Sequence, residues 1–182
     1  MIKERLVGYI EDSIRQNWEI EALSNYTEKG YTYKEIAEKI LKIHILFRET
    51  GIREGDKIAL VGRNSANWCV VYLATVTYGA VIVPILPDFR PDDTMNIINH
   101  SDSKILYTDD KLFELLDPSR MPEIGGIVSL DNLRQLTGSS PAFRNAYEAA
   151  DAIFEKQYPV LKKEDIHFSE ISNDKLAVIS YT

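Results

Sequence analysis

The chain has 182 residues, the usual size of one medium domain or of one layer of a larger one. With 45% hydrophobic and 27% charged residues, it has the composition of a globular protein, which excludes collagen-like, coiled-coil and disordered chains. Its formal net charge is −7, and no block of lysine and arginine stands out. We therefore expect no nucleic-acid partner, because binding to a phosphate backbone requires clustered cations.

The only cysteine is Cys69, so neither an internal disulfide nor a cysteine-rich metal site can form. This cysteine usage fits a reducing cytoplasm, which is the localisation we expect. Glu11 and Asp12 interrupt the N-terminal stretch where a signal peptide needs a continuous apolar core. The longest apolar run, residues 68–77, is shorter than the about 20 residues that cross a bilayer, so we expect no transmembrane segment.

Residues 1–30 are predicted to form an N-terminal helix and a connection, because Leu6, Ile10 and Ile14 recur at helical spacing. A short strand end is predicted to follow at residues 31–33.

A second helix is predicted to begin at Thr32, because Thr32 and Glu35 have the spacing of a capping box. This helix carries apolar residues on one face as far as Phe47. Gly51 supplies the left-handed backbone that is common just past a helix end.

From residue 57 onward, short apolar runs alternate with helical patterns, as in parallel α/β layers. The predicted strands are residues 57–61, 80–86, 104–108, 126–130 and 176–181. Helices are predicted between the first two strands and at residues 91–100, 110–116 and 143–157. This order predicts an α/β fold: a doubly wound, mainly parallel sheet with covering helices.

Cap residues mark the ends of these helices. Asn64 or Ser65 is predicted to cap the first of them, and Gly79 to end it. Pro91 occupies a first helical position, where its fixed backbone angle is favourable. Thr108 or Asp109 is predicted to cap the helix at residues 110–116.

We expect residues 1–182 to form one α/β subdomain. Residues 136–141 have the composition of a linker, since they combine glycine, serine and proline. Residues 137–172 are predicted to be a weakly patterned insert in which a single amphipathic helix stands out.

Most signals of chemistry are absent. Gly62 stands alone in its turn, so there is no dinucleotide fingerprint, and no Walker loop occurs. The three histidines, His44, His100 and His167, are not spaced as metal ligands, and we expect no metal site among them. His44 lies on an apolar helix face and is predicted to be a hydrogen-bonded core residue. Cys69 is predicted to be a buried structural thiol.

Asp109 and Asp110 follow a predicted strand, which is also how phospho-receiver domains hold magnesium. A receiver, however, places its acidic pair after the first strand and its phospho-accepting aspartate at the end of a later one. Here Asp117 follows the pair within one short segment, so we interpret the pair as part of a helix start.

Five segments in fixed order carry the informative signal: residues 31–36 (YTYKEI), 55–60 (GDKIAL), 64–68 (NSANW), 78–84 (YGAVIVP) and 173–182 (NDKLAVISYT). Together they resemble successive motifs of the adenylate-forming (AMP-binding) superfamily. The last segment and the length of the insert before it make the chain most similar to bacterial long-chain fatty acid–CoA ligases.

That resemblance implies the first subdomain of the superfamily's large N-terminal domain, ending at the strand before the phosphate-binding loop. It implies a parent enzyme that uses ATP, Mg²⁺ and coenzyme A to convert a fatty acid to its thioester through an acyl adenylate. Tyr181 and Thr182 would begin the loop that binds ATP phosphate or magnesium. No catalytic residue is expected in this chain, which alone would be inactive. Peripheral membrane contact and a homodimer are compatible with the resemblance.

Two kinds of alternative remain at this stage. Within the superfamily, an aryl–CoA ligase and an amino-acid adenylation domain fit the same motifs. Outside it, the strand and helix pattern fits a non-catalytic, flavodoxin-like α/β binding module that uses no ATP.

Overall fold

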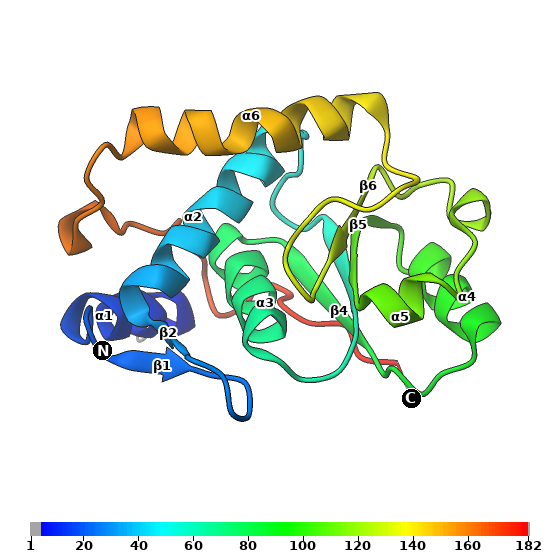
Figure 1. Ribbon diagram of the computed structural model, residues 1–182, viewed down its shortest axis with the longest axis horizontal. Coiled ribbons are helices and arrows are strands. Elements are labelled where there is room, and N and C mark those ends of the chain that lie inside the picture. The colour runs from blue at the N-terminus through cyan, green and yellow to red at the C-terminus, as the bar shows by residue number, and fades with distance from the viewer. Residues whose placement is uncertain (1–4, 182) are drawn as a thin grey trace.

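The computed structural model describes residues 5–181 and shows a parallel sheet with helices on both faces (Figure 1). The helices are α1 (Leu6–Gln16), α2 (Tyr33–Glu49), α3 (Ala66–Tyr78), α4 (Pro91–His100), α5 (Asp110–Phe113) and α6 (Pro141–Gln157), with short 3-10 turns η1 (Pro118–Arg120) and η2 (Lys163–Asp165). The strands are β1 (Glu21–Leu23), β2 (Tyr31–Thr32), β3 (Lys57–Val61), β4 (Val81–Ile85), β5 (Ser103–Thr108) and β6 (Gly126–Ser129). The predicted α/β class is therefore confirmed.

The main sheet has the strand order β4-β3-β5-β6, and all its pairs are parallel. Ile58 of β3 is in register with Ile82 of β4 on one side and with Ile105 of β5 on the other. The chain thus adds β4 on one side of β3 and then returns to add β5 on the other, which is doubly wound topology. The short strands β1 and β2 form a separate antiparallel pair.

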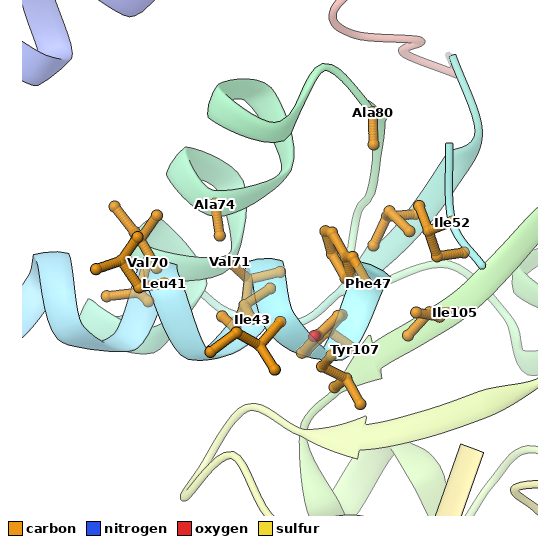
Figure 2. Close-up of a cluster of buried hydrophobic side chains, with 14 of the residues drawn as sticks. Leu41, Ile43, Phe47, Ile52, Val70, Val71, Ala74, Ala80, Ile105 and Tyr107 are labelled. Carbon is orange, nitrogen blue, oxygen red and sulfur yellow. The ribbon is translucent and has the colours of Figure 1, made fainter. Parts of the chain in front are cut away.

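Each face of the sheet has its own apolar core, because successive strand residues point to opposite faces. On one face, strand residues pack with helices α2, α3 and α6, and Figure 2 shows part of this cluster. These strand residues are Ile58, Leu60, Ile82, Ile105, Tyr107 and Val128. On the other face, the residues between them pack against Met95 and Ile98 of α4: Ala59, Val61, Val83, Ile85, Leu106 and Ile127. The two covered faces explain why the strands read as continuous apolar runs.

The predicted helix starts are confirmed at α2 and α3. The Glu35 backbone N–H donates to Thr32 Oγ1 at 3.2 Å, and the Thr32 N–H donates to Glu35 Oε2 at 2.7 Å. This backbone hydrogen bond is the largest cause of a lowered pKa at Glu35. At α3, Ser65 rather than Asn64 is the cap, since its Oγ accepts from the Trp68 N–H at 3.1 Å.

Gly79 ends α3 as predicted, with a left-handed φ of 88°. A Cβ atom at this position would lie 3.2 Å from Ile171 Cδ1 and 3.3 Å from Glu54 Cγ. Gly79 is therefore required both by its backbone angle and by its buried surroundings.

The strand predicted at residues 176–181 is wrong in extent, because only Val178 forms a bridge, parallel to Ile82 at the outer edge of β4. The Ile82 N–H donates to the Ala177 carbonyl at 2.9 Å, and the Ile179 N–H donates to the Ile82 carbonyl at 3.0 Å. The next donor on this side of β4 would be residue 84, since alternate residues of a parallel strand face the same neighbour. That residue is Pro84, which has no N–H, so the ladder stops after one step.

The linker predicted at residues 136–141 is also wrong, because this segment is hydrogen-bonded to β6. The Leu136 N–H donates to the Ile127 carbonyl at 2.8 Å, and the Ile127 N–H donates to Ser139 Oγ at 2.9 Å. Leu136 and Ser139 are both buried. The segment therefore satisfies backbone groups of an edge strand, a role that its composition does not reveal.

Gly79→Val should destabilise the chain more than the same change at Gly55. Gly55 has a similar φ of 85°, but no atom lies within 4 Å of its virtual Cβ. We expect Gly55→Val to cost only left-handed strain, about 1–2 kcal/mol. Gly79→Val should add overpacking against Ile171, for a total of roughly 2–5 kcal/mol. Urea unfolding of both variants measures the difference, and equal losses would contradict the buried placement of Gly79.

Candidate functional site

The carboxyl ends of β3 and β5 mark the point where the winding of the sheet reverses. In open α/β sheets this switch point is where ligands usually bind. The first residues beyond the two strands are Gly62 and Arg63 after β3 and Asp109 after β5.

The Asp109 carboxylate links the carboxyl ends of these two strands. Its Oδ2 accepts from the Arg63 backbone N–H at 3.1 Å. A Cβ atom on Gly62 would lie 2.8 Å from Asp109 Oδ1 and 2.6 Å from Leu130 Cδ1. Because glycine has no Cβ, the side chains of Asp109 and Leu130 can lie close to the backbone of Gly62. The Arg63 backbone N–H at this switch point is therefore already bound by a carboxylate of the same chain.

The prediction that Thr108 or Asp109 caps α5 is wrong for the side chains. Asp109 occupies the N-cap position of α5 but makes no capping hydrogen bond. Its carboxylate is directed to Arg63 instead. The hydroxyl of Thr108 is buried and has no hydrogen-bond partner within residues 5–181.

The environment of Asp109 raises the pKa of its carboxyl group. Burial is the largest cause, and the charges of Asp131 and Asp110 act in the same direction. The hydrogen bond from the Arg63 N–H opposes them. The charged form of Asp109 therefore lowers the stability of the folded chain.

Asp110 is bound by other groups of the chain. Its Oδ2 lies 2.5 Å from Nη2 of Arg134, and its backbone N–H donates to Asp131 Oδ2 at 3.1 Å. A hydrogen bond from Ser129, followed by the contact with Arg134, lowers the pKa of Asp110. In the described part of the chain, no three histidine, cysteine or acidic side chains are grouped so that they could hold a metal ion. The geometry gives the phospho-receiver interpretation no support.

Of the two predicted phosphate-loop residues, Tyr181 is described and Thr182 lies outside the described residues. A hydrogen bond of 2.8 Å joins the Tyr181 hydroxyl to Nδ1 of His100, at the end of α4. The two rings meet edge to face, with centroids 5.7 Å apart. The role of both loop residues stays a prediction. Sequence reasoning missed His100, and a contact across 81 positions leaves no local signal.

His44 is a hydrogen-bonded core residue, as predicted. Its Nε2 lies 2.9 Å from the Ala74 carbonyl and 3.1 Å from Thr77 Oγ1. Burial lowers its pKa to about 4, so the ring is neutral at pH 7. Cys69 is half-buried rather than buried, and burial raises the pKa of its thiol, which disfavours the reactive thiolate.

No helix within residues 5–181 is long and apolar enough to cross a membrane.

The comparisons with known proteins agree with the observed fold. A model of the AMP-binding enzyme family matches residues 10–182. The long-chain-fatty-acid–CoA ligase of Thermus thermophilus is 27% identical over 129 residues, which are 71% of this chain and 23% of that protein. The medium-chain fatty-acid–CoA ligase of Escherichia coli is 29% identical over 120 residues, 60% of this chain and 21% of that protein. This chain thus spans less than a quarter of either relative.

Among solved structures, the anthranilate CoA ligase AuaEII in complex with anthranoyl-AMP superposes with a TM-score of 0.75 at 15% identity. The match covers 100% of this chain and 32% of that one. Residues 5–181 therefore have the fold of the N-terminal subdomain of adenylate-forming enzymes.

The family match goes further than the fold. Because it covers nearly every residue, the chain belongs to the AMP-binding enzyme family. The three similar proteins are named for long-chain acids, medium-chain acids and anthranilate. The predicted membership of the adenylate-forming family is therefore confirmed. The prediction that the acid is a long-chain fatty acid is not confirmed.

Asp109→Asn should stabilise the chain at pH 7, because asparagine keeps an acceptor for the Arg63 N–H without the charge. Since the folded-state pKa of Asp109 is raised, its destabilising effect is absent below about pH 4 and complete at neutral pH. We expect only a small rise in the melting temperature at pH 7, no more than about 2 °C, because Asp109 is partly exposed and water screens its charge. The gain should vanish near pH 3.

Asp88→Asn is the matched control, since Asp88 is exposed in the loop after β4. It should leave the melting temperature unchanged at both pH values. A lower melting temperature for Asp109→Asn at pH 7 would show that the fold requires the charge.

Proposed function

We propose that this chain is the first subdomain of an ATP-dependent acid–CoA ligase. In the first reaction, a carboxylate oxygen of the acid attacks the α-phosphorus of ATP and pyrophosphate leaves. In the second, the thiol of coenzyme A attacks the acyl carbon and AMP leaves. The observation that carries the proposal is the match of the AMP-binding family over residues 10–182.

The acid that we propose is a long-chain fatty acid. The similarity to the Thermus thermophilus ligase and the phrase LAVISYT at residues 176–182 support this choice. An aryl acid is the second candidate, because the fold also superposes on a ligase named for anthranilate. The family match removes support from a flavodoxin-like module that uses no ATP.

In this proposal the chain positions groups and does not itself carry out bond exchange. Adenylate formation depends mainly on orientation and on neutralising phosphate charge. Val178 is bridged to Ile82 at the edge of β4, and the Tyr181 hydroxyl is hydrogen-bonded to His100. These two contacts would fix the direction in which the chain continues into the phosphate loop. The Thr182 hydroxyl would then face the phosphates. Residues 5–181 offer no ligand cluster for Mg²⁺, so no step is assigned to a metal on this chain.

The 182-residue chain alone should be inactive. Exchange of labelled pyrophosphate into ATP, measured with palmitate and magnesium, should stay at background because the phosphate loop is not in this sequence. A longer protein that contains this chain together with the family's phosphate loop should be active in the same assay. Exchange by the 182-residue chain above background would contradict its role as a subdomain.

In the longer protein, Thr182→Ala should slow adenylate formation about tenfold to a hundredfold. This is the effect of losing one hydrogen bond to a charged group, about 1.5–3 kcal/mol. Thr182→Ser keeps the hydroxyl and should remain near the wild-type rate. The Michaelis constant for the fatty acid should change little, because the hydroxyl acts on the phosphates. If alanine and serine behave alike, Thr182 is not in the phosphate site.

A further inference from the structure

The last described segment of the chain, residues 177–181, has few backbone hydrogen bonds. Its backbone is bonded to β4 through Ile82 alone, whose N–H donates to the Ala177 carbonyl and whose carbonyl accepts from the Ile179 N–H. In the described part of the chain, no backbone hydrogen bond joins a later residue of this segment to the sheet, because Pro84 ends the ladder. The direction of the segment beyond Ile179 therefore depends on side-chain contacts.

The side chain of Tyr181 makes such a contact with His100 of α4. Its hydroxyl lies 2.8 Å from Nδ1 of the imidazole, and the two rings meet at 87° with their centroids 5.7 Å apart. A tyrosine hydroxyl can donate to a neutral imidazole nitrogen or accept from a protonated one, so the hydrogen bond does not require one charge state. Tyr181 and Ile179 also pack against the apolar core on the α4 face of the sheet. This packing half-buries the Tyr181 ring, whereas the hydrogen bond fixes the direction of its hydroxyl.

His100 lies at a helix end that is itself fixed to the sheet. Met95 and Ile98, in the same helix, are buried in the core between α4 and the strands. The next residue, Ser101, is also buried, and its hydroxyl donates to the Ile98 carbonyl at 2.9 Å. The same hydroxyl lies 2.7 Å from the hydroxyl of Ser103, the first residue of β5. His100 is therefore a rigid point of contact for Tyr181.

We propose that His100 is a positioning residue, which binds Tyr181 and thereby fixes the position from which the following residues enter the phosphate site. The inference rests on the proposed function, in which those residues begin the phosphate loop. His100 lies outside the five segments that carry the family resemblance, and in this proposal it touches neither ATP nor the acid. Its effect on the reaction is indirect, because adenylate formation depends on how exactly the loop donors are oriented toward the phosphates.

Hydrogen exchange of the 182-residue chain tests the contact without reference to activity. His100→Phe keeps a ring beside Tyr181 and removes the hydrogen bond. We expect this variant to speed exchange of the Ile179 amide about twofold to tenfold, the effect of losing one hydrogen bond between partly exposed groups. His100→Asn, whose amide can take the place of Nδ1, should return the exchange rate to near the wild-type value. Tyr181→Phe should match His100→Phe, and the double variant should exchange no faster than either single variant.

Asn99→Ala is the matched control. Asn99 precedes His100 in the last turn of α4, and its side-chain amide also makes a hydrogen bond of 2.8 Å, but to the Arg120 carbonyl. This variant should leave the exchange of the Ile179 amide unchanged. If it speeds exchange as much as His100→Phe does, the end of α4 is a general support for the segment and His100 has no specific role.

Kinetics of a longer protein that contains this chain together with the family's phosphate loop test the positioning role. His100→Phe should lower kcat/KM for ATP in adenylate formation about twofold to tenfold. The KM for palmitate should stay unchanged, because His100 acts on the phosphate site alone. His100→Asn should recover the wild-type rate, and Asn99→Ala should retain it.

The two measurements separate the possible failures. An inactive wild-type longer protein would contradict the proposed function, and the exchange data would still decide whether His100 fixes Tyr181. An active enzyme in which His100→Phe and Asn99→Ala have equal rates would overturn the positioning role. Unchanged exchange of the Ile179 amide in His100→Phe would overturn the contact on which the inference depends.

Discussion

The double pairing of β3 is the constraint on which the rest of the structure depends. β3 has parallel neighbours on both sides and buries its side chains alternately on both faces, with Ile58 and Leu60 in one core and Ala59 and Val61 in the other. Each fully buried aliphatic side chain contributes about 1.5–3 kcal/mol. Because both faces must be dry, helices have to cover both, and the chain must cross from one face to the other. The switch point beside Asp109 is a consequence of that crossing.

The elements that sequence reasoning located correctly are those whose cause is local. The capping box of Thr32 and Glu35, the cap at Ser65 and the left-handed Gly79 each depend on residues within one helical turn. The errors arise where the cause lies elsewhere in the chain. Residues 136–141 are ordered by Ile127, and the segment around Val178 is limited by Pro84, almost a hundred positions earlier. The composition of a segment does not show which backbone groups it will hydrogen-bond to in the folded chain.

The same distinction applies to the candidate sites. The family motifs point to Tyr181 without any knowledge of the fold, but its partner His100 comes from a separate helix. The sequence analysis singled out no residue of the pocket between α2 and α6, because only the packing of these helices against the sheet encloses it. The free hydroxyl of Tyr107 is invisible in the sequence, where Tyr107 is one more residue in an apolar strand. Enclosed space and unpaired donors are properties of tertiary packing.

Pro84 has a consequence beyond ending the ladder with residues 177–179. An exposed strand edge is a template on which a strand of another molecule can add, and this is a common start of aggregation. Beyond Ile82, the outer edge of β4 would offer its next donor at residue 84, where proline has none. A foreign strand could therefore make no continuous ladder there. Pro84 thus ends the pairing of β4 with residues 177–179 and also denies a strand of another molecule a continuous row of donors. Self-association of this subdomain through the edge of β4 is therefore disfavoured.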